Sequence, residues 1–433
     1  MIWSAVLGTA GDWIRPPAER EERRRHRQSR AAGLLARALG DLKGAFVKAG
    51  QFASVRHDVL PDVVSRELAT LRDRVPPLPF AQIRRVVERA FGAPLSSLYA
   101  HFEPEPVGAA SVAQVHRATL PDGRQVAVKV QYPWIEASRG TDLAILRGVL
   151  RVAIWLGGKR DLDLDRFFAE FAKGLEEELD FTREARVATE IAENLAGDAQ
   201  IVVPRIVQSL TRRTVLTMSY HDAIPISDRA ALQEQGVAPG KVLEVLARAY
   251  AKQVFVDGLF HADPHPGNLF VIPPGPDGGD QPVVLFVDFG LCKRLDPELR
   301  RQMRKGLYAV LQRDADDFVA RMDAMGMIAP GAQDAVHGAV EQMFEHLAEQ
   351  SGERGPLGVR GSQVLALKDV AKGLLQDTPG LQLPNDLLLY AKTLSYLFQL
   401  GEELDPEVDL VAISLPYLLK FLAEKDPEPE GRA

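Results

Sequence analysis

The chain has 433 residues, of which 46% are hydrophobic and 26% are charged, an ordinary composition for globular domains. Its formal net charge of -7, with 52 Lys and Arg against 59 Asp and Glu, argues against nucleic acid as a partner. The one cysteine, Cys292, excludes an intramolecular disulfide and a multi-cysteine zinc site. It also fits a reducing compartment, so we expect a cytoplasmic protein.

The N-terminal region departs from this acidic balance. Residues 15–37 hold eight Arg and three Glu, a local net charge of +5. A solvated helix face with Glu–Arg pairs explains this segment most simply, and contact with an anionic membrane or an acidic partner is the alternative. We find no signal peptide, and no apolar stretch of about 18 residues that predicts a spanning helix. Any membrane contact is therefore expected to be peripheral.

The hydrophobic periodicity changes several times along the chain. Residues 1–100 have Leu and Arg at helical spacing and predict a helical N-terminal extension. Residues 111–132 alternate around the turn Pro121–Gly123 and predict a β-hairpin, which is followed by helical sequence to about residue 198. Residues 201–220 are β-branched and alternating, and they predict a strand pair.

The later part of the chain is predicted to be helical, except for two short apolar runs at residues 268–272 and 283–289. The order of these elements is that of a protein kinase. We therefore expect an α+β, two-lobed, protein-kinase-like fold. Its parts are a helical extension (1–100), a small N-lobe with an antiparallel sheet (101–222), a mostly helical C-lobe (223–423) and a polar tail (424–433).

The segment "HADPHPGN" has the spacing of a kinase catalytic loop. His261, Asp263 and Asn268 match H-x-D-x-x-x-x-N, and Asp288, Phe289 and Gly290 follow as D-F-G 20 residues after Asn268. Because Mg²⁺ prefers oxygen ligands, we expect Asn268 and Asp288 to bind the metal. Asp263 is then placed to accept or orient a proton of the attacking group. The alternative is a capped, Pro-rich turn, and the second motif at this distance disfavours it.

Lys129 in "VAVKV" supplies a third part of the kinase pattern, a lysine on the third strand that contacts the nucleotide phosphates. The usual partner of this lysine is a Glu on a nearby helix. The segment "GLEEELDFTREA" offers five acidic residues on what we predict to be one amphipathic helix. Their spacing does not choose among Glu176, Glu177, Glu178, Asp180 and Glu184.

Two features depart from protein kinases. The phosphate-binding loop is Ala-rich, "VGAASV", with Gly108, Ala109, Ala110, Ser111 and Val112, so it is expected to hold nucleotide differently from a Gly-rich loop. Ala262 stands where a kinase has the arginine that meets a phosphorylated activation loop, and no Ser, Thr or Tyr occurs between Asp288 and Tyr308. Both observations argue against a conventional protein kinase.

Taken together, the motifs resemble the AarF/UbiB family of atypical kinases. The motifs that carry the resemblance are "KAGQ" with Lys48 and Gln51, the Ala-rich loop, "VAVK", Glu178-x-Asp180, "HADPHPGN" and "DFG". The resemblance implies that Lys48 and Gln51 reach the active site and restrain protein phosphorylation. It also implies that Glu178 is the partner of Lys129, that Asp180 joins the same network as Lys48, and that the Ala-rich loop alters nucleotide preference.

The same resemblance implies an ATPase, or a kinase of a lipid or small molecule, that binds ATP and Mg²⁺ and supports ubiquinone or other isoprenoid-lipid metabolism. Its expected partners are an isoprenoid lipid or quinone intermediate and enzymes of quinone biosynthesis. Backbone groups near Met218 and Tyr220 are expected to meet adenine, although Ser219 replaces the family's usual acid there.

Two alternatives stay open. A kinase of the aminoglycoside or choline type shares the loop pattern but gives no reason for "KAGQ", and a scaffold without turnover gives no reason for Lys129, Asp263 and Asp288. Two further residues are expected to be structural. Cys292 is expected to be a small packed residue rather than a reactive thiol, and His265 to be a hydrogen-bond donor that fixes its loop.

Overall fold

The computed structural model describes residues 77–110, 112–135, 140, 143–144, 147, 164–275, 281–351, 378–381 and 383–425. Predictions for residues 1–76, which include Lys48 and Gln51, and for Ser111 lie outside these ranges. The chain divides into two compact units. Among described residues, the first contains 77–86, 104–115 and 130–179, and the second contains 87–103, 116–129 and 180–425. The domain boundaries expected from the sequence stay predictions.

A four-stranded sheet has the strand order β1-β2-β3-β5. Its strands are β1 (His101–Ala109), β2 (Ala113–Thr119), β3 (Gln125–Gln131) and β5 (Val215–Ser219), and two helices precede it, α5 (Phe80–Phe91) and α6 (Leu95–Leu98). The turn between β2 and β3 contains Gly123 at φ +86°, a conformation that favours glycine. The Leu120 N–H donates to the Arg124 carbonyl and closes this turn. The predicted hairpin is confirmed.

The acidic segment after this sheet lies on two helices and not on one, which corrects the prediction. Helix α8 (Leu164–Glu178) ends in the first unit, and α9 (Phe181–Leu195) begins the long part of the second. Asp180 is the N-cap of α9, because its Oδ1 accepts from the Thr182 N–H (3.0 Å) and hydroxyl (2.6 Å). An Asp side chain that caps a helix start favours non-helical backbone at its own position, so the two helices are separate.

A second four-stranded sheet, of order β4-β9-β8-β6, lies within the second unit. Its strands are β4 (Ile201–Val202), β6 (Ile224–Pro225), β8 (Leu269–Ile272) and β9 (Val283–Phe286). The predicted runs around β8 and β9 are confirmed as an antiparallel pair, with Leu269 opposite Phe286. The strand pair predicted for residues 201–220 is confirmed only in part. Ile206 and Met218 form an antiparallel bridge, with the Val207 N–H donating to the Thr217 carbonyl (2.8 Å), but the named strands take other partners, β4 with β9 and β5 with β3. Strands this short take their partner from tertiary packing and not from sequence neighbours.

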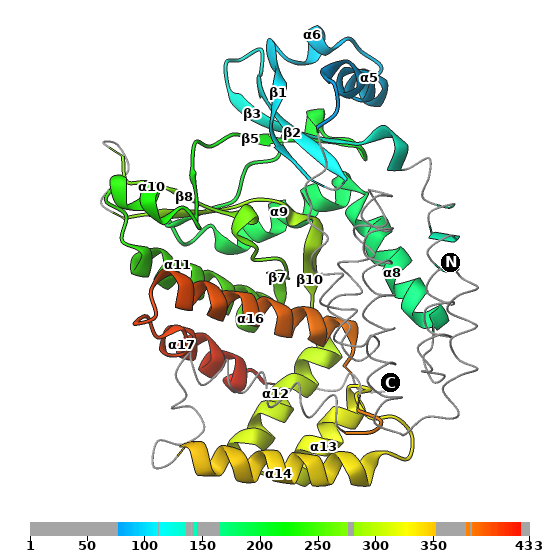
Figure 1. Cartoon of the computed structure of the whole chain (residues 1–433), viewed down its shortest axis with the longest axis vertical. Helices are drawn as coiled ribbons and strands as arrows, with labels where there is room; N and C mark the ends of the chain where they lie inside the picture. Colours follow the sequence, from blue (N-terminus) through cyan, green and yellow to red (C-terminus); the bar gives the residue numbers. More distant parts are fainter. Residues whose placement is uncertain are drawn as a thin grey trace, which may run out of the picture. The chain divides into compact units, whose positions relative to one another are not determined.

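The remainder of the second unit is mostly helical (Figure 1). Its long helices are α11 (Pro239–Ala251), α12 (Pro297–Gln312), α13 (Ala315–Ala324), α14 (Gln333–Ser351), α16 (Asn385–Leu404) and α17 (Leu410–Ala423), with the short α10 (Arg229–Glu234) and η2 (Gln208–Leu210). A continuous apolar core joins α9, α11 and α16 to strands β8 and β9. Among the helices in the described ranges, none has both the length and the hydropathy required to cross a bilayer.

The C-terminal end of α11 leads, through a π-helical segment and a short strand, into the polar loop "HADPHPGN". The helix continues as a π-helical segment, η3 (Lys252–Asp257), and stops at Gly258, whose φ is +65°. Two short strands then pair antiparallel, β7 (Leu259–His261) and β10 (Cys292–Arg294). The loop after β7 leads to η4 (Pro266–Asn268), and η5 (Phe289–Leu291) precedes β10. This pairing, which the sequence does not indicate, brings "HADPHPGN" beside "DFG".

Candidate functional site

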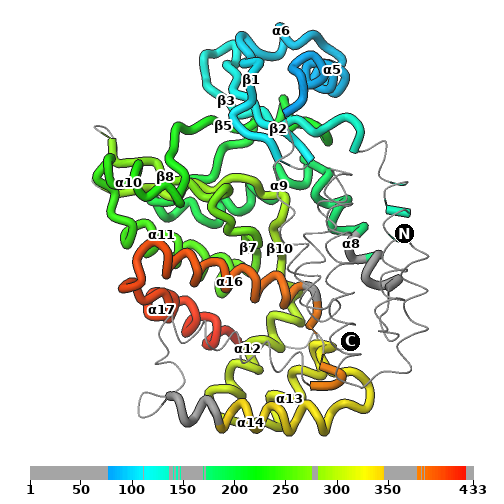
Figure 2. The backbone as a smooth tube through the Cα atoms, viewed as in Figure 1, coloured from blue at the N-terminus to red at the C-terminus, as the bar shows by residue number. Residues whose placement is uncertain are grey.

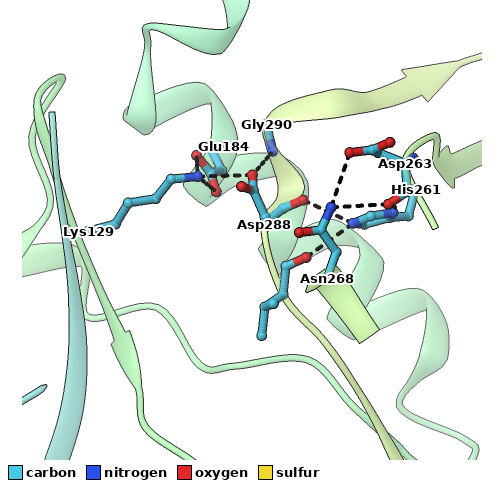
Figure 3. Close-up of polar contacts among 8 residues, drawn as sticks. Lys129, Glu184, His261, Asp263, Asn268, Asp288 and Gly290 are labelled. Atoms are coloured by element: carbon cyan, nitrogen blue, oxygen red, sulfur yellow. Dashed lines mark hydrogen bonds and ion pairs between the residues drawn. The ribbon is translucent and has the colours of Figure 1, made fainter. Parts of the chain in front are cut away.

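Lys129, on β3, forms a buried ion-pair network. Its ammonium lies 2.9 Å from Glu184 Oε1, 3.1 Å from Glu184 Oε2 and 2.9 Å from Asp288 Oδ1 (Figure 3). Burial by itself lowers the pKa of Lys129, but the Asp288 and Glu184 carboxylates raise it by more, so the pKa is above its ordinary value. The lysine is therefore a fixed positive charge, and the ring of Phe181 lies 5.2 Å from it.

The partner of Lys129 corrects one expectation. The resemblance selected Glu178, but the hydrogen-bonded partner is Glu184, which comes six residues later on the first turns of α9. Glu178 is the last residue of α8 and belongs to the first unit. The helix restart at Asp180 changes which acidic side chains face Lys129. The local sequence signal for this restart is the Asp-x-Thr capping pattern of Asp180 and Thr182.

Asp288 has a backbone conformation that is rare for residues other than glycine, with φ +59° and ψ +82°. Its Oδ1 accepts from the Gly290 N–H (3.2 Å) as well as from Lys129. The next residue, Phe289, is 2% exposed and lies in the core of the second unit. The buried ring and the local hydrogen bond hold Asp288 in this conformation, with its side chain 40% exposed.

His261 connects the catalytic-loop sequence to the D-F-G sequence. Its Nε2–H donates to the Asp288 carbonyl oxygen (2.9 Å), and its Nδ1 lies 3.4 Å from the Asp263 N–H, which donates to it. The backbone N–H of His261 donates to Gln253 Oε1 on η3 (2.9 Å). His261 is fully buried, and its ring packs edge-on against Phe289. The imidazole thus holds the two polar segments at a fixed separation.

Asp263 and Asn268 face each other across the loop. The Asn268 amide nitrogen donates to Asp263 Oδ2 and to the Asp263 carbonyl oxygen, both at 3.1 Å. The amide oxygen is thereby turned away from Asp263, and Figure 3 shows it on the side of Asp288. On its other oxygen, Asp263 accepts from Lys392 of α16 at 3.3 Å, a contact that sequence reasoning missed.

The residues of the site fit a magnesium ion. An amide oxygen from Asn268 and a partly exposed carboxylate from Asp288 are hard oxygen donors of the kind that Mg²⁺ prefers. Within the described ranges no group of three or more His, Cys, Asp or Glu side chains is arranged to hold a metal. Mg²⁺ usually binds through one or two protein carboxylates and completes its shell with waters and phosphate oxygens.

The Ala-rich loop belongs to the first unit. The Ala110 N–H donates to the Ala113 carbonyl (2.8 Å), and the Val112 side chain is buried. Gly108 has no positive φ, and nothing lies within 4 Å of the position that a Cβ would take. Gly108 is therefore not required by local backbone geometry, and the predicted role of this loop in nucleotide binding stays a prediction.

The segment expected to meet adenine lies at the end of β5. Met218 is 6% exposed. The Tyr220 N–H donates to the Gln125 carbonyl (3.1 Å), so this donor is used within the protein. The Ser219 hydroxyl lies 2.9 Å from His221 Nε2, and burial lowers the pKa of that imidazole. The adenine contact at Met218 and Tyr220 stays a prediction.

Three further residues have structural roles. His265 accepts from the Gly267 N–H (3.1 Å) through Nδ1, so it fixes the loop as an acceptor and not as the donor we expected. Cys292 is buried, and desolvation raises the pKa of its thiol well above the ordinary value, as expected for a packed residue. Ala262 is fully buried in an apolar cluster with Val254, Phe260, Leu295 and Leu389.

Comparison with known sequences gives a consistent result. The family model described as "ABC1 atypical kinase-like domain" matches residues 70–322. A Marinobacter nauticus protein named "Probable protein kinase UbiB" is 34% identical over 398 residues, which are 90% of this chain and 69% of the relative. A protein of the same name from Pseudomonas paraeruginosa is 32% identical over 425 residues, covering 98% of this chain and 76% of the relative.

Among solved structures, the complex of Rv3197 with erythromycin from Mycobacterium tuberculosis superposes with a TM-score of 0.53. The match covers 89% of this chain and 98% of that one, at 23% sequence identity. At this level of identity the likeness concerns the fold. The α+β, protein-kinase-like fold class expected from the order of elements is confirmed.

Proposed function

Since this chain belongs to the AarF/UbiB family of atypical kinases, we propose that it binds Mg-ATP and transfers or hydrolyses the terminal phosphoryl group. The proposal rests on one observation: Lys129, Asp263, Asn268 and Asp288 join one hydrogen-bonded constellation, although 159 residues separate the first from the last. These are the residue types that phosphoryl transfer requires, in the order that kinases use.

Each residue has a separate role in the proposed reaction. Asn268 and Asp288 hold Mg²⁺, which when bound neutralises charge on the phosphates. Lys129, oriented by Glu184, binds the α and β phosphates. Asp263 orients the attacking oxygen and accepts its proton. The bond from the γ phosphorus to the β–γ bridging oxygen breaks, a bond to the attacking oxygen forms, and ADP leaves.

The acceptor is proposed to be water, a lipid or a small molecule, and not a protein. Helix α12 begins at Pro297, three residues after β10 ends at Arg294, so this stretch holds no extended platform for a peptide. The buried Ala262 cannot meet a phosphorylated loop as an arginine does. In addition, Lys48 and Gln51 are proposed to restrain protein phosphorylation, as the family resemblance implies.

The physiological role is proposed to be support of ubiquinone or other isoprenoid-lipid metabolism. The family resemblance implies partners among quinone-biosynthesis enzymes and an isoprenoid lipid or quinone intermediate. Peripheral membrane contact through the basic residues 15–37 is part of this proposal. A small-molecule kinase of the aminoglycoside or choline type, and a nucleotide-binding scaffold without turnover, are the alternatives.

The first test is Mg²⁺-dependent ATP hydrolysis by the purified chain, with and without anionic liposomes and a quinone-precursor phenol. The Asp288→Asn variant is expected to lose at least about 10²-fold in kcat, because one carboxylate ligand of the metal is removed. Asp296→Asn is the matched control. Asp296 caps α12 through the Glu298 and Leu299 N–H groups, and Asn is an equally good cap.

The outcomes separate the candidate functions. Hydrolysis that liposomes stimulate and that Asp288→Asn abolishes supports the membrane-coupled ATPase. Phosphorylation of an aminoglycoside or of choline, with "KAGQ" variants unchanged, favours the small-molecule kinase. Nucleotide binding measured by calorimetry, without turnover under any of these conditions, favours the scaffold and contradicts the proposed enzyme.

A further inference from the structure

Helix α16 places a lysine against the catalytic-loop aspartate. Lys392 follows Asp263 by 129 residues, yet its ammonium lies 3.3 Å from Asp263 Oδ1. The two side chains are 23% and 30% exposed, so the pair lies at the edge of the protein interior. Neither the family motifs nor the spacing of the segment "LLYAKTLSY" gave this residue a role.

Helix α16 runs beside β7 and β10 (Figure 2), and several side-chain contacts fix it against the catalytic loop and β10. Leu389 packs on Ala262 in the apolar cluster beneath the loop. The Thr393 hydroxyl lies 3.3 Å from the Ala262 carbonyl oxygen. In the first turn of α16, Asp386 forms an ion pair with Lys293 of β10 at 2.6 Å. The backbone that carries Lys392 is therefore set in place by its neighbours on both sides.

The carboxylate of Asp263 is held at both oxygens by different donors. The Asn268 amide nitrogen binds Oδ2 at 3.1 Å, and Lys392 binds Oδ1 at 3.3 Å. The Lys392 ammonium also lies 5.4 Å from the centre of the Tyr396 ring, one turn along α16, which favours this position of the charge. Two donors on two oxygens fix the plane of the carboxylate, whereas Asn268 alone leaves it free to rotate.

We propose that Lys392 is a positioning residue of the phosphoryl-transfer site, which orients the Asp263 carboxylate toward the attacking hydroxyl or water. This inference rests on the proposed function, in which Asp263 accepts the proton of the attacking oxygen. A carboxylate oxygen has two lone-pair sites, so the bond from Lys392 leaves a second site for that proton. Lys392 acts through Asp263 and makes no contact with the nucleotide in this scheme.

The test compares Lys392→Met and Lys392→Arg with wild type in steady-state ATP hydrolysis. Lys392→Met is expected to lower kcat about 10- to 100-fold, the range for a misplaced general base, with the KM for Mg-ATP within about twofold. Lys392→Arg is expected to recover part of the loss because it keeps a donor and a charge. Gln399→Ala is the matched control, since it removes an exposed side-chain contact of the same helix, from Gln399 to Glu403, without touching Asp263.

A double substitution distinguishes positioning from a general effect on the fold. In the Asp263→Asn background, with residual rates measured in single turnovers with excess protein, adding Lys392→Met is expected to change kcat less than about twofold. An equal loss in both backgrounds, a raised KM, or an unchanged kcat in Lys392→Met overturns the inference while the proposed function stands. No hydrolysis by wild type refutes the proposed function itself, and the inference falls with it.

Discussion

The buried ion pair between Lys129 and Glu184 gives a quantitative prediction. At the 2.9 Å separation of Nζ and Oε1, two unit charges attract by about 6 kcal/mol at an effective dielectric constant of about 20. Desolvation of both groups offsets part of this, and removing one partner of a buried pair costs about 3–5 kcal/mol. Because Asp288 still pairs with Lys129, we expect Glu184→Ala to lower the free energy of unfolding by about 3 kcal/mol, at the lower end of that range.

The same substitution should impair turnover. Without Glu184, Asp288 is the remaining carboxylate that pairs with Lys129, so the ammonium is drawn toward Asp288, the proposed metal ligand, and away from the proposed phosphate position. We expect kcat/KM for Mg-ATP to fall about 10²-fold, the cost of a displaced positioning group. Unfolding in urea, followed by circular dichroism, measures the stability, and coupled ADP release measures turnover.

Glu190→Ala is the matched control for this experiment. Glu190 also lies on α9, but its ion pair with Arg294 is 43% exposed on the Glu side and 56% on the Arg side. An exposed pair contributes about 0–1 kcal/mol, so this variant should unfold and turn over nearly as wild type does. The reasoning is refuted if Glu184→Ala matches Glu190→Ala in both assays. It is also refuted if Glu178→Ala reproduces the combined loss and Glu184→Ala does not.

Three other substitutions or treatments test separate parts of the structure. Desolvation raises the pKa of Asp180, but the bonds from Thr182 lower it by more, so its pKa lies below the ordinary value. At pH values above the ordinary aspartate pKa, Asp180→Ala should therefore lower the free energy of unfolding by about 1 kcal/mol. This difference from wild type should vanish as the pH falls through the depressed pKa of Asp180 in the folded protein. Urea unfolding between pH 7 and pH 3 measures this, and a difference that grows toward low pH contradicts it. Cys292, with its raised pKa, should resist iodoacetamide at pH 8 in the native protein and react after unfolding, and rapid native labelling detected by mass spectrometry would exclude the buried thiol. Ala262→Arg should lose more than about 4 kcal/mol, because it buries a charge among apolar side chains, and a thermal midpoint equal to wild type would show that the site tolerates it.

Much of the site follows from local sequence. The hairpin that carries Lys129 is predicted because alternation and a Gly turn are local signals, and both are confirmed. The loop residues Asp263 and Asn268 meet because their spacing spans one tight, Pro-rich turn. The left-handed φ of Asp288 was not predicted, since nothing in the three letters of D-F-G shows which backbone conformation the buried Phe289 enforces.

Tertiary packing decided the rest. Glu184 and not Glu178 is the partner of Lys129 because the Asp180 cap, a local signal, separates α8 from α9, and because tertiary packing then brings the first turns of α9 to Lys129. Lys392 reaches Asp263 because an apolar cluster packs α16 against the loop. A contact between residues 129 positions apart produces no periodic pattern in the sequence, so it could not be predicted. Sequence patterns report a residue's near neighbours along the chain, whereas ion pairs between distant segments form only where the core fixes both backbones.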